Sequence, residues 1–139
     1  MADEPVLDHH AALIHVMVLT AAADADMTDA EMQAIGEMVR MLPVFRDYDM
    51  DRLSTDASAC ADLLSESDGL DTALSLVAEA LPNKLCETAY ALACDVAAAD
   101  GVVSQEESRL LEMIRYRLAV GRLPAAAIER GARARHARL

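Results

Sequence analysis

Apolar side chains recur along the chain at intervals of three and four residues, which is the period of an amphipathic α-helix. No stretch alternates strictly enough between apolar and polar residues to form a strand. The pattern therefore predicts an all-α fold of about seven helices. We expect a single domain over residues 1–139.

Proline, glycine and cap residues set the expected ends of these helices. We predict helices over residues 5–23, 28–42, 49–64, 70–81, 83–99, 104–119 and 124–135. Pro43 and Pro82 stop the second and fourth helices, and Gly121 stops the sixth. The segments 13–23 and 83–99 are apolar on nearly every side, so we expect them in the centre of the domain.

One acidic segment occurs twice. Residues 22–31, AADADMTDAE, align without a gap with residues 98–107, AADGVVSQEE, at an offset of 76. Each copy follows an Ala-rich apolar stretch and leads into an amphipathic one. We interpret the chain as an internal duplication, in which a helix, an acidic turn and a second helix are built twice in a pseudo-two-fold arrangement.

Each acidic segment contains a capping box, Thr28 with Glu31 and Ser104 with Glu107. In this motif the hydroxyl accepts an early backbone N–H of the helix, and the glutamate accepts the N–H of the cap residue. These four residues therefore have a structural role that needs no ligand.

The aspartates of the turns have two explanations, which the sequence leaves open. Asp24 and Asp100 follow buried helices, whose negative C-terminal pole disfavours a carboxylate by about 0.3–1 kcal/mol. Either the carboxylates accept backbone N–H groups in Asx-type turns, or they face a bound cation. The candidate metal ligands are Asp24, Asp26, Glu31, Asp100 and Glu107. Ligands that are all oxygen indicate a hard divalent cation, namely Ca²⁺, Mg²⁺ or Mn²⁺.

Charge divides the chain into an acidic body and a basic end. Residues 1–108 hold four Lys or Arg against 22 Asp or Glu, whereas residues 109–139 hold eight Arg against two Glu. The acidic body repels phosphate backbones, and aromatic residues make up only 3% of the chain, so we expect no nucleic-acid binding. The Arg-rich helix within 122–139 either neutralises the body as a solvated helix or contacts an anionic membrane surface or an acidic partner.

Other patterns narrow the class of protein. The N-terminus is acidic, and the longest apolar run, residues 11–23, is shorter than the roughly 20 residues that span a bilayer. We therefore expect a soluble cytoplasmic protein that is not itself transmembrane. Cys60, Cys86 and Cys94 form no Cys-x-x-Cys pair and are predicted to be buried thiols. No hydrolase, metalloprotease or phosphate-loop motif is present, which favours a non-enzymatic role.

An Ala-rich helix followed by Ala-x-Asp-Gly-x-x-x-x-x-Glu, repeated once, resembles the TerB (tellurite resistance protein B) family. The second copy matches fully, and in the first Ala25 replaces the glycine. The likeness covers about residues 11–121 and leaves the Arg-rich helix outside. It implies an all-helical pseudo-two-fold domain, a role in metal or oxyanion stress such as tellurite resistance, and acidic turns that bind divalent cations. It also implies a protein partner, including a membrane-associated complex of the TerC type.

Two functional hypotheses follow. The first is a divalent-cation-binding stress protein of the TerB type that uses the acidic turns. The second is a metal-free helical interaction module, as an adaptor or beside co-chaperones, whose working surface is a helix face or the region 115–138. A homodimer is compatible with either. Neutralising Asp24 and Asp100 together is expected to abolish cation-dependent stabilisation under the first hypothesis, and to be neutral or stabilising under the second.

Overall fold

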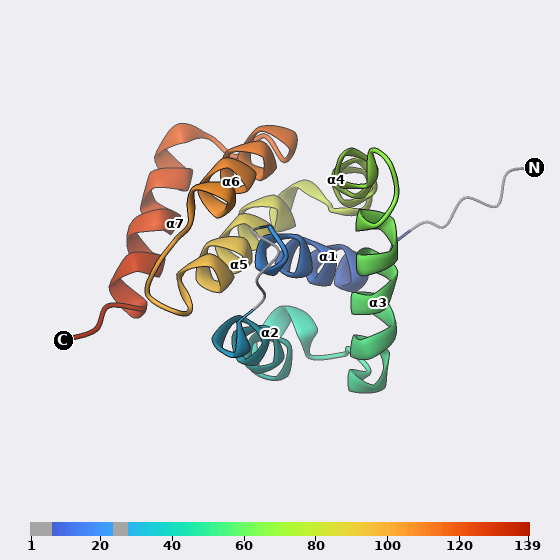
Figure 1. Ribbon diagram of the computed structural model, residues 1–139, viewed down its shortest axis with the longest axis horizontal. Helices are drawn as coiled ribbons and strands as arrows, with labels where there is room; N and C mark the ends of the chain where they lie inside the picture. The colour runs from blue at the N-terminus through green and yellow to red at the C-terminus, as the bar shows by residue number, and fades with distance from the viewer. Residues whose placement is uncertain (1–6, 24–27) are drawn as a thin grey trace, which may run out of the picture.

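The computed structural model describes residues 7–23 and 28–139 of the chain. These residues form seven α-helices and three short 3₁₀-helices, and contain no strand, so the predicted all-α fold is confirmed (Figure 1). The α-helices are α1 (His9–Ala21), α2 (Asp29–Met41), α3 (Leu53–Leu64), α4 (Gly69–Ala80), α5 (Cys86–Ala98), α6 (Gln105–Arg117) and α7 (Arg122–Arg135). The 3₁₀-helices are η1 (Pro43–Phe45), η2 (Met50–Arg52) and η3 (Asn83–Leu85).

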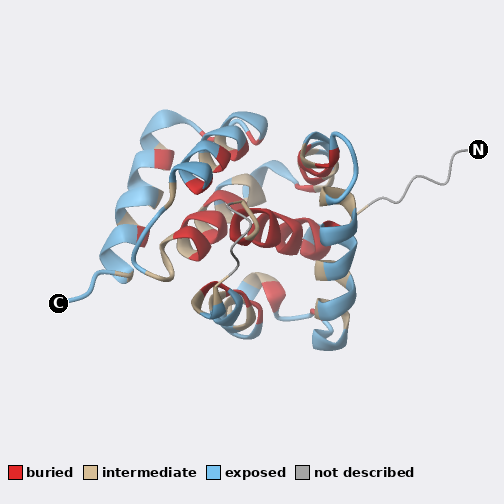
Figure 2. Ribbon diagram, in the orientation of Figure 1, coloured by how far each residue is buried: buried red, intermediate tan, exposed pale blue. Residues whose placement is uncertain are grey.

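Helix α1 lies at the centre of the molecule. Twelve of its thirteen residues are buried, as are seven of the thirteen residues of α5. The two helices pack against each other, and α1 also contacts α2, α3, α4 and α6 (Figures 1 and 2). Ala12, Ala89 and Ala93 are fully buried, and side chains this small let helices approach closely. The two apolar segments therefore form the core, as their sequences predicted.

Most helix ends differ from their predicted positions by one to four residues, and two of these differences have a clear physical cause. The first helix begins at His9 rather than near residue 5, because the Asp8 carboxylate caps it and accepts the N–H of Ala11 at 2.8 Å. The sixth helix is not ended by Gly121. Instead Ala119 takes a left-handed conformation with φ of 54°, and the N–H of Val120 donates to the carbonyl of Arg115 at 3.0 Å. This is a Schellman-type ending, and Gly121 serves as the cap residue of α7.

The link between α3 and α4 depends on one glycine. Asp68 has a left-handed backbone with φ of 60°. A Cβ atom at Gly69 would lie 1.8 Å from the carbonyl oxygen of Leu63, so no other residue fits without a backbone shift. The turn between the third and fourth predicted helices therefore requires glycine at position 69 for a steric reason.

Helix α7 packs on α5 and contributes to the core. Ala125 and Ala132 are each 3% exposed, and the Arg135 guanidinium forms an ion pair with Asp95 of α5 at 2.7 Å. The rest of α7 is largely exposed (Figure 2). The Arg-rich end is thus a docked helix that stops at Arg135, not a detached tail. Within the described part of the chain, no helix has the length and apolar character needed to cross a membrane.

Candidate functional site at the acidic turns

The helices that follow the two acidic turns start in the same way. At α2, the N–H of Thr28 donates to Glu31 Oε1 at 2.9 Å, and the N–H of Glu31 donates to Thr28 Oγ1 at 3.1 Å. At α6, the equivalent bonds between Ser104 and Glu107 are both 3.0 Å. Both predicted capping boxes are therefore confirmed, although the duplication behind them stays a prediction.

The capping glutamates are buried. Glu31 and Glu107 are each 2% exposed, whereas a capping box requires only a hydrogen bond at the helix start and no burial of the glutamate. A carboxylate loses hydration when it is buried, and this cost must be offset by hydrogen bonds or by positive charge. The two turns therefore share a second feature besides the cap, namely a buried glutamate at positions 76 residues apart.

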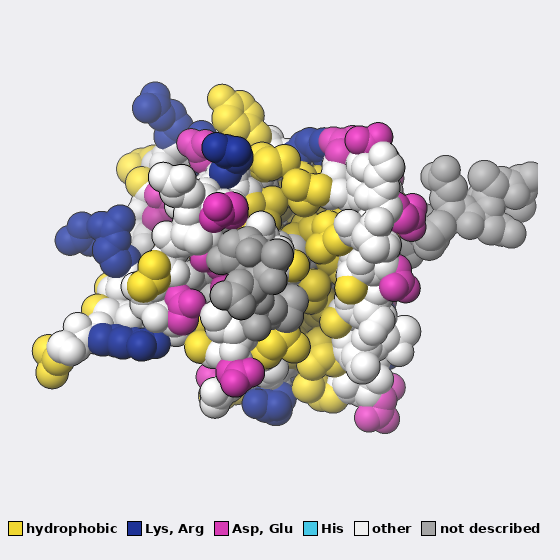
Figure 3. Space-filling view, viewed as in Figure 1, with side chains coloured by type: hydrophobic (Ala, Val, Ile, Leu, Met, Phe, Trp, Pro, Cys, Tyr) yellow, Lys and Arg dark blue, Asp and Glu magenta, His cyan; other side chains and the backbone are white. Residues whose placement is uncertain are grey.

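The two helix–turn–helix units are interleaved. Helix α1 contacts α6 of the other unit, and α5 contacts α2. Ala22 and Ala23, which follow α1, line a hollow of about 420 Å³ together with Glu106 and Leu110 of α6. The chain leading into the first acidic turn therefore lies beside the helix that follows the second. In the view of Figure 3, apolar side chains gather along the inner side of α3 and α4, toward the centre of the molecule.

The second acidic turn has the geometry of an Asx turn. The N–H of Val102 donates to Asp100 Oδ1 at 3.1 Å, and Gly101 has a φ of 87°, a left-handed conformation that favours glycine. Of the two explanations for Asp100, an Asx-type turn or a bound cation, the Asx turn is thus present. Asp24 and Asp26 lie outside the described residues, so their roles stay predictions.

The side chains of the acidic turns carry donor atoms that suit a hard cation. Glu31, Asp100 and Glu107 offer carboxylate oxygens, which suit Ca²⁺, Mg²⁺ or Mn²⁺. A carboxylate has two oxygens and about four lone pairs, so a capping bond or an Asx turn is compatible with ligation by the same side chain. Within residues 7–23 and 28–139, however, no three His, Cys, Asp or Glu side chains meet closely enough to hold a metal ion. Asp24 and Asp26 are the remaining candidate ligands of the turns.

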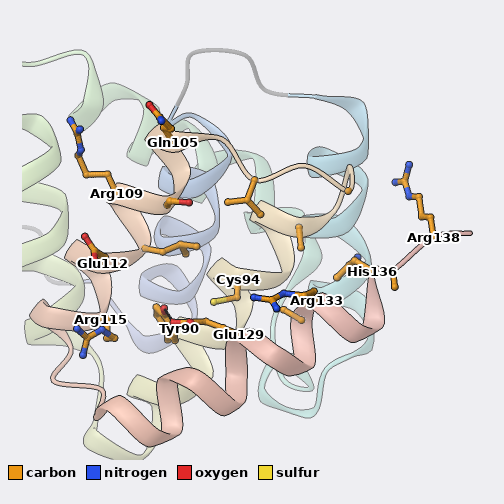
Figure 4. Close-up of a pocket in the computed structure, with 17 residues that line it drawn as sticks. Tyr90, Cys94, Gln105, Arg109, Glu112, Arg115, Glu129, Arg133, His136 and Arg138 are labelled. Atoms are coloured by element: carbon orange, nitrogen blue, oxygen red, sulfur yellow. Dashed lines mark hydrogen bonds between the residues drawn. The ribbon is translucent and has the colours of Figure 1, made fainter.

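A second feature, which the sequence analysis did not predict, is a cleft of about 1060 Å³ between α5, α6 and α7 (Figure 4). At its floor the Tyr90 hydroxyl donates to Glu129 Oε2 at 2.5 Å. Burial, followed by this bond to Glu129, raises the pKa of Tyr90 above its usual value. The basic composition of residues 109–139 was the available signal. The cleft itself depends on the packing of α7 against α5.

The prediction of buried thiols is confirmed for two of the three cysteines. Cys60 and Cys94 are buried, and Cys86 is half-buried. Burial raises the pKa of the Cys60 and Cys94 thiols to about 12 each. These two thiols are therefore protonated at neutral pH, and a protonated thiol is a poor nucleophile.

Comparison with known proteins identifies a family for the chain. A family model described as "Tellurite resistance protein TerB" matches residues 10–129. The match runs past the predicted end of the likeness at Gly121 and takes in the first part of α7. No curated protein and no solved structure matches the chain significantly. Since the family match spans most of the sequence, the chain belongs to the TerB family.

Proposed function

We propose that this protein is a non-enzymatic cytoplasmic stress protein of the tellurite-resistance type, which binds a divalent cation at its acidic turns. Its ligands are drawn from Asp24, Asp26, Glu31, Asp100 and Glu107. The observation that carries the proposal is the pair of capping glutamates, each 2% exposed, at matched places in the two units. Membership of the TerB family supports it. A TerC-type membrane-associated complex is the proposed partner.

The electrostatics of the turns favour a bound cation. The N-terminal poles of α2 and α6 stabilise the glutamates that cap them, by about 0.3–1 kcal/mol for an exposed carboxylate and up to about 2 kcal/mol in partly buried sites. Asp100 lies at the opposite, negative pole of α5, where the helix disfavours its charge. The 22 acidic residues among residues 1–108 add further repulsion. A divalent cation bound at the turns offsets the repulsion at Asp100 and within the acidic body.

The experiment is thermal unfolding of the chelator-treated protein, with and without Ca²⁺, Mg²⁺ or Mn²⁺, at a salt concentration that screens the net charge of −12. We expect one ion to raise the midpoint of the wild-type protein, and Asp24→Asn with Asp100→Asn to abolish this rise. Asparagine keeps the side-chain oxygen that accepts the N–H of Val102, so the second turn is preserved.

The matched control is Asp62→Asn with Glu66→Gln, which removes the same charge from exposed residues at the end of α3. This variant should keep the ion-dependent rise. A rise of equal size with all three ions, retained in the turn variant, would show general charge screening and would contradict the proposal.

A second candidate function is a metal-free helical interaction module. The cleft between α5, α6 and α7 favours it, because several arginines line this cleft. Under this alternative, the turn variant is neutral or more stable than wild type, and no ion shifts the midpoint.

A further inference from the structure

The cleft between α5, α6 and α7 is basic although the protein is acidic. Its volume of about 1060 Å³ matches the upper end of ligand pockets, which span about 300–1000 Å³. Its cationic lining residues are Arg109, Arg115, Arg133 and Arg138. Only Glu112 and Glu129 oppose them there, while the whole chain carries a net charge of −12. Positive charge is therefore concentrated at one place.

The four arginines that line the cleft form no ion pair among the described residues, whereas three arginines elsewhere do. Arg52 forms an ion pair with Asp8 at 2.9 Å, Arg117 pairs with Asp71, and Arg135 pairs with Asp95 at 2.7 Å. In the described part of the chain, no carboxylate oxygen lies within 4.0 Å of a guanidinium nitrogen of the four cleft arginines.

Two of these four groups bond only to backbone oxygens. Arg138 donates to the carbonyl of Ala99 at 3.1 Å, and Arg115 donates to that of Val120 at 3.5 Å while it lies over the Tyr116 ring. Such bonds leave the charge of a guanidinium without a counter-ion. The two acidic residues that line the cleft therefore offset only part of its positive charge.

The floor of the cleft is fixed and partly apolar. Tyr90 is 2% exposed and holds Glu129 by the 2.5 Å hydrogen bond, which occupies one of the two acidic side chains that line the cleft. Apolar side chains lie between the charged ones, from Ala98, Leu111, Ala132 and Ala137. A ligand that fits this surface combines negative charge with apolar groups.

The arrangement of the arginines indicates an extended ligand. Figure 4 shows Arg109 and Arg115 apart from each other along α6, Arg133 pointing from α7 toward Cys94 and Glu129, and Arg138 at the far end. Recognition of one phosphate or carboxylate uses guanidinium groups that converge on it. Guanidinium groups spread along a cleft instead match carboxylates spaced along a chain, and each arginine can bind one of them through two N–H bonds.

We propose that the cleft between α5, α6 and α7 binds an acidic, partly apolar peptide segment of another protein, whose Asp or Glu side chains pair with Arg109, Arg115 and Arg133. This inference names a surface and a partner chemistry for the protein, and it does not rest on cation binding at the turns. The acidic residues of the rest of the protein repel such a segment. This repulsion steers the segment toward the basic cleft.

The test is selection from a display library of short random peptides on the full chain, in chelator and at physiological salt, with counter-selection against Arg109→Glu plus Arg133→Glu. We expect the enriched peptides to carry several Asp or Glu residues among apolar ones. Fluorescence anisotropy with the best labelled peptide should show affinity at least about tenfold weaker for the double variant, equivalent to the loss of one good contact. NMR shifts should map to α5, α6 and α7.

Two further variants complete the design. Arg40→Glu with Arg46→Glu reverses two exposed arginines near the end of α2 and should leave peptide affinity unchanged. If the charge-reversed cleft variant fails to fold by circular dichroism, Arg109→Gln with Arg133→Gln replaces it, with a weaker loss of the same sign.

Three results would overturn the inference. One is that no acidic peptide is enriched, and another is that the enriched peptides bind wild type and cleft variant equally. The third is that inorganic phosphate, citrate or phosphatidylserine vesicles occupy the cleft while the library yields nothing. Because selection is done in chelator, peptide binding without any ion-dependent midpoint shift would support the cleft and reject the cation site, and the reverse result would do the opposite.

Discussion

The two helix–turn–helix units share their caps and differ in their surroundings. Both units hold a capping glutamate that is 2% exposed. At the offset of 76, however, His15 in the core of α1 is matched by Ala91 of α5, and Ala119 after α6 is matched by Pro43 after α2. The common part among the described residues is therefore the capping box with its buried glutamate, while core packing and helix endings are particular to each unit. This contrast supports placing function at the turns.

Removing the capping glutamates gives the largest expected effect, and it tests whether the units are equivalent. Glu31→Ala and Glu107→Ala each delete a bond to the cap residue's N–H and leave a space in a buried site. We expect each to lower the free energy of unfolding by about 1–3 kcal/mol in chelator, measured by chemical denaturation.

The matched changes Glu31→Gln and Glu107→Gln keep an oxygen that can accept the same N–H, so their losses should be smaller. A large loss at one glutamate and none at the other would show that the two caps are not energetically equivalent.

Acid should act through the first unit, because only α1 of the two central helices carries a histidine. His15 is 1% exposed, Nδ1 donates to the carbonyl of Ala11 at 2.8 Å, and Nε2 has no hydrogen-bond partner among the described residues. Burial lowers the pKa of His15 below its ordinary 6.5, despite the opposing effects of the Ala11 bond and of Asp56.

The direction of the pH effect follows from proton uptake. Below pH 6.5 the unfolded state binds a proton that His15 in the folded state does not, so stability falls as the pH drops from 6.5 toward the folded pKa. We expect His15→Gln to reduce this loss, as measured by denaturation between about pH 7.5 and pH 5. An unchanged acid dependence in His15→Gln would contradict the assignment to this residue.

A substitution at the end of α6 gives the smallest expected change in stability. Ala119 holds a left-handed φ of 54°, which glycine adopts without steric cost. Ala119→Gly should therefore stabilise the protein by about 0.5–1 kcal/mol in thermal unfolding. The same substitution at exposed Ala127 inside α7 should destabilise it by about 1 kcal/mol. Destabilisation by both would show that the ending of α6 does not favour glycine.

The features that the sequence predicted are those set by local rules. Apolar periodicity located the helices, and the hydroxyl–glutamate spacing located both capping boxes, because each of these bonds joins residues three positions apart. The central position of α1 and α5 was predicted because their sequences are apolar on nearly every side of the helix. The Asx turn at Asp100 was one of two predicted explanations, and it too is a local hydrogen bond.

The features that the sequence missed depend on contacts between distant residues. Ala119 has no intrinsic preference for a left-handed backbone. It takes one where Val120, 5% exposed, turns inward between α6 and α7. The basic cleft likewise requires α7 to dock on α5 through residues such as Ala132 and the Arg135–Asp95 ion pair. The composition of residues 109–139 indicated positive charge, but not which face of the protein carries it.

The most direct test of cation binding at the acidic turns is isothermal titration calorimetry of Ca²⁺, Mg²⁺ and Mn²⁺ into chelator-treated protein. The proposal predicts saturable binding of one of these ions to the wild-type chain, and its loss in the variant with Asp24→Asn and Asp100→Asn. Absence of saturable heat for all three ions, or equal binding by wild type and variant, would contradict it.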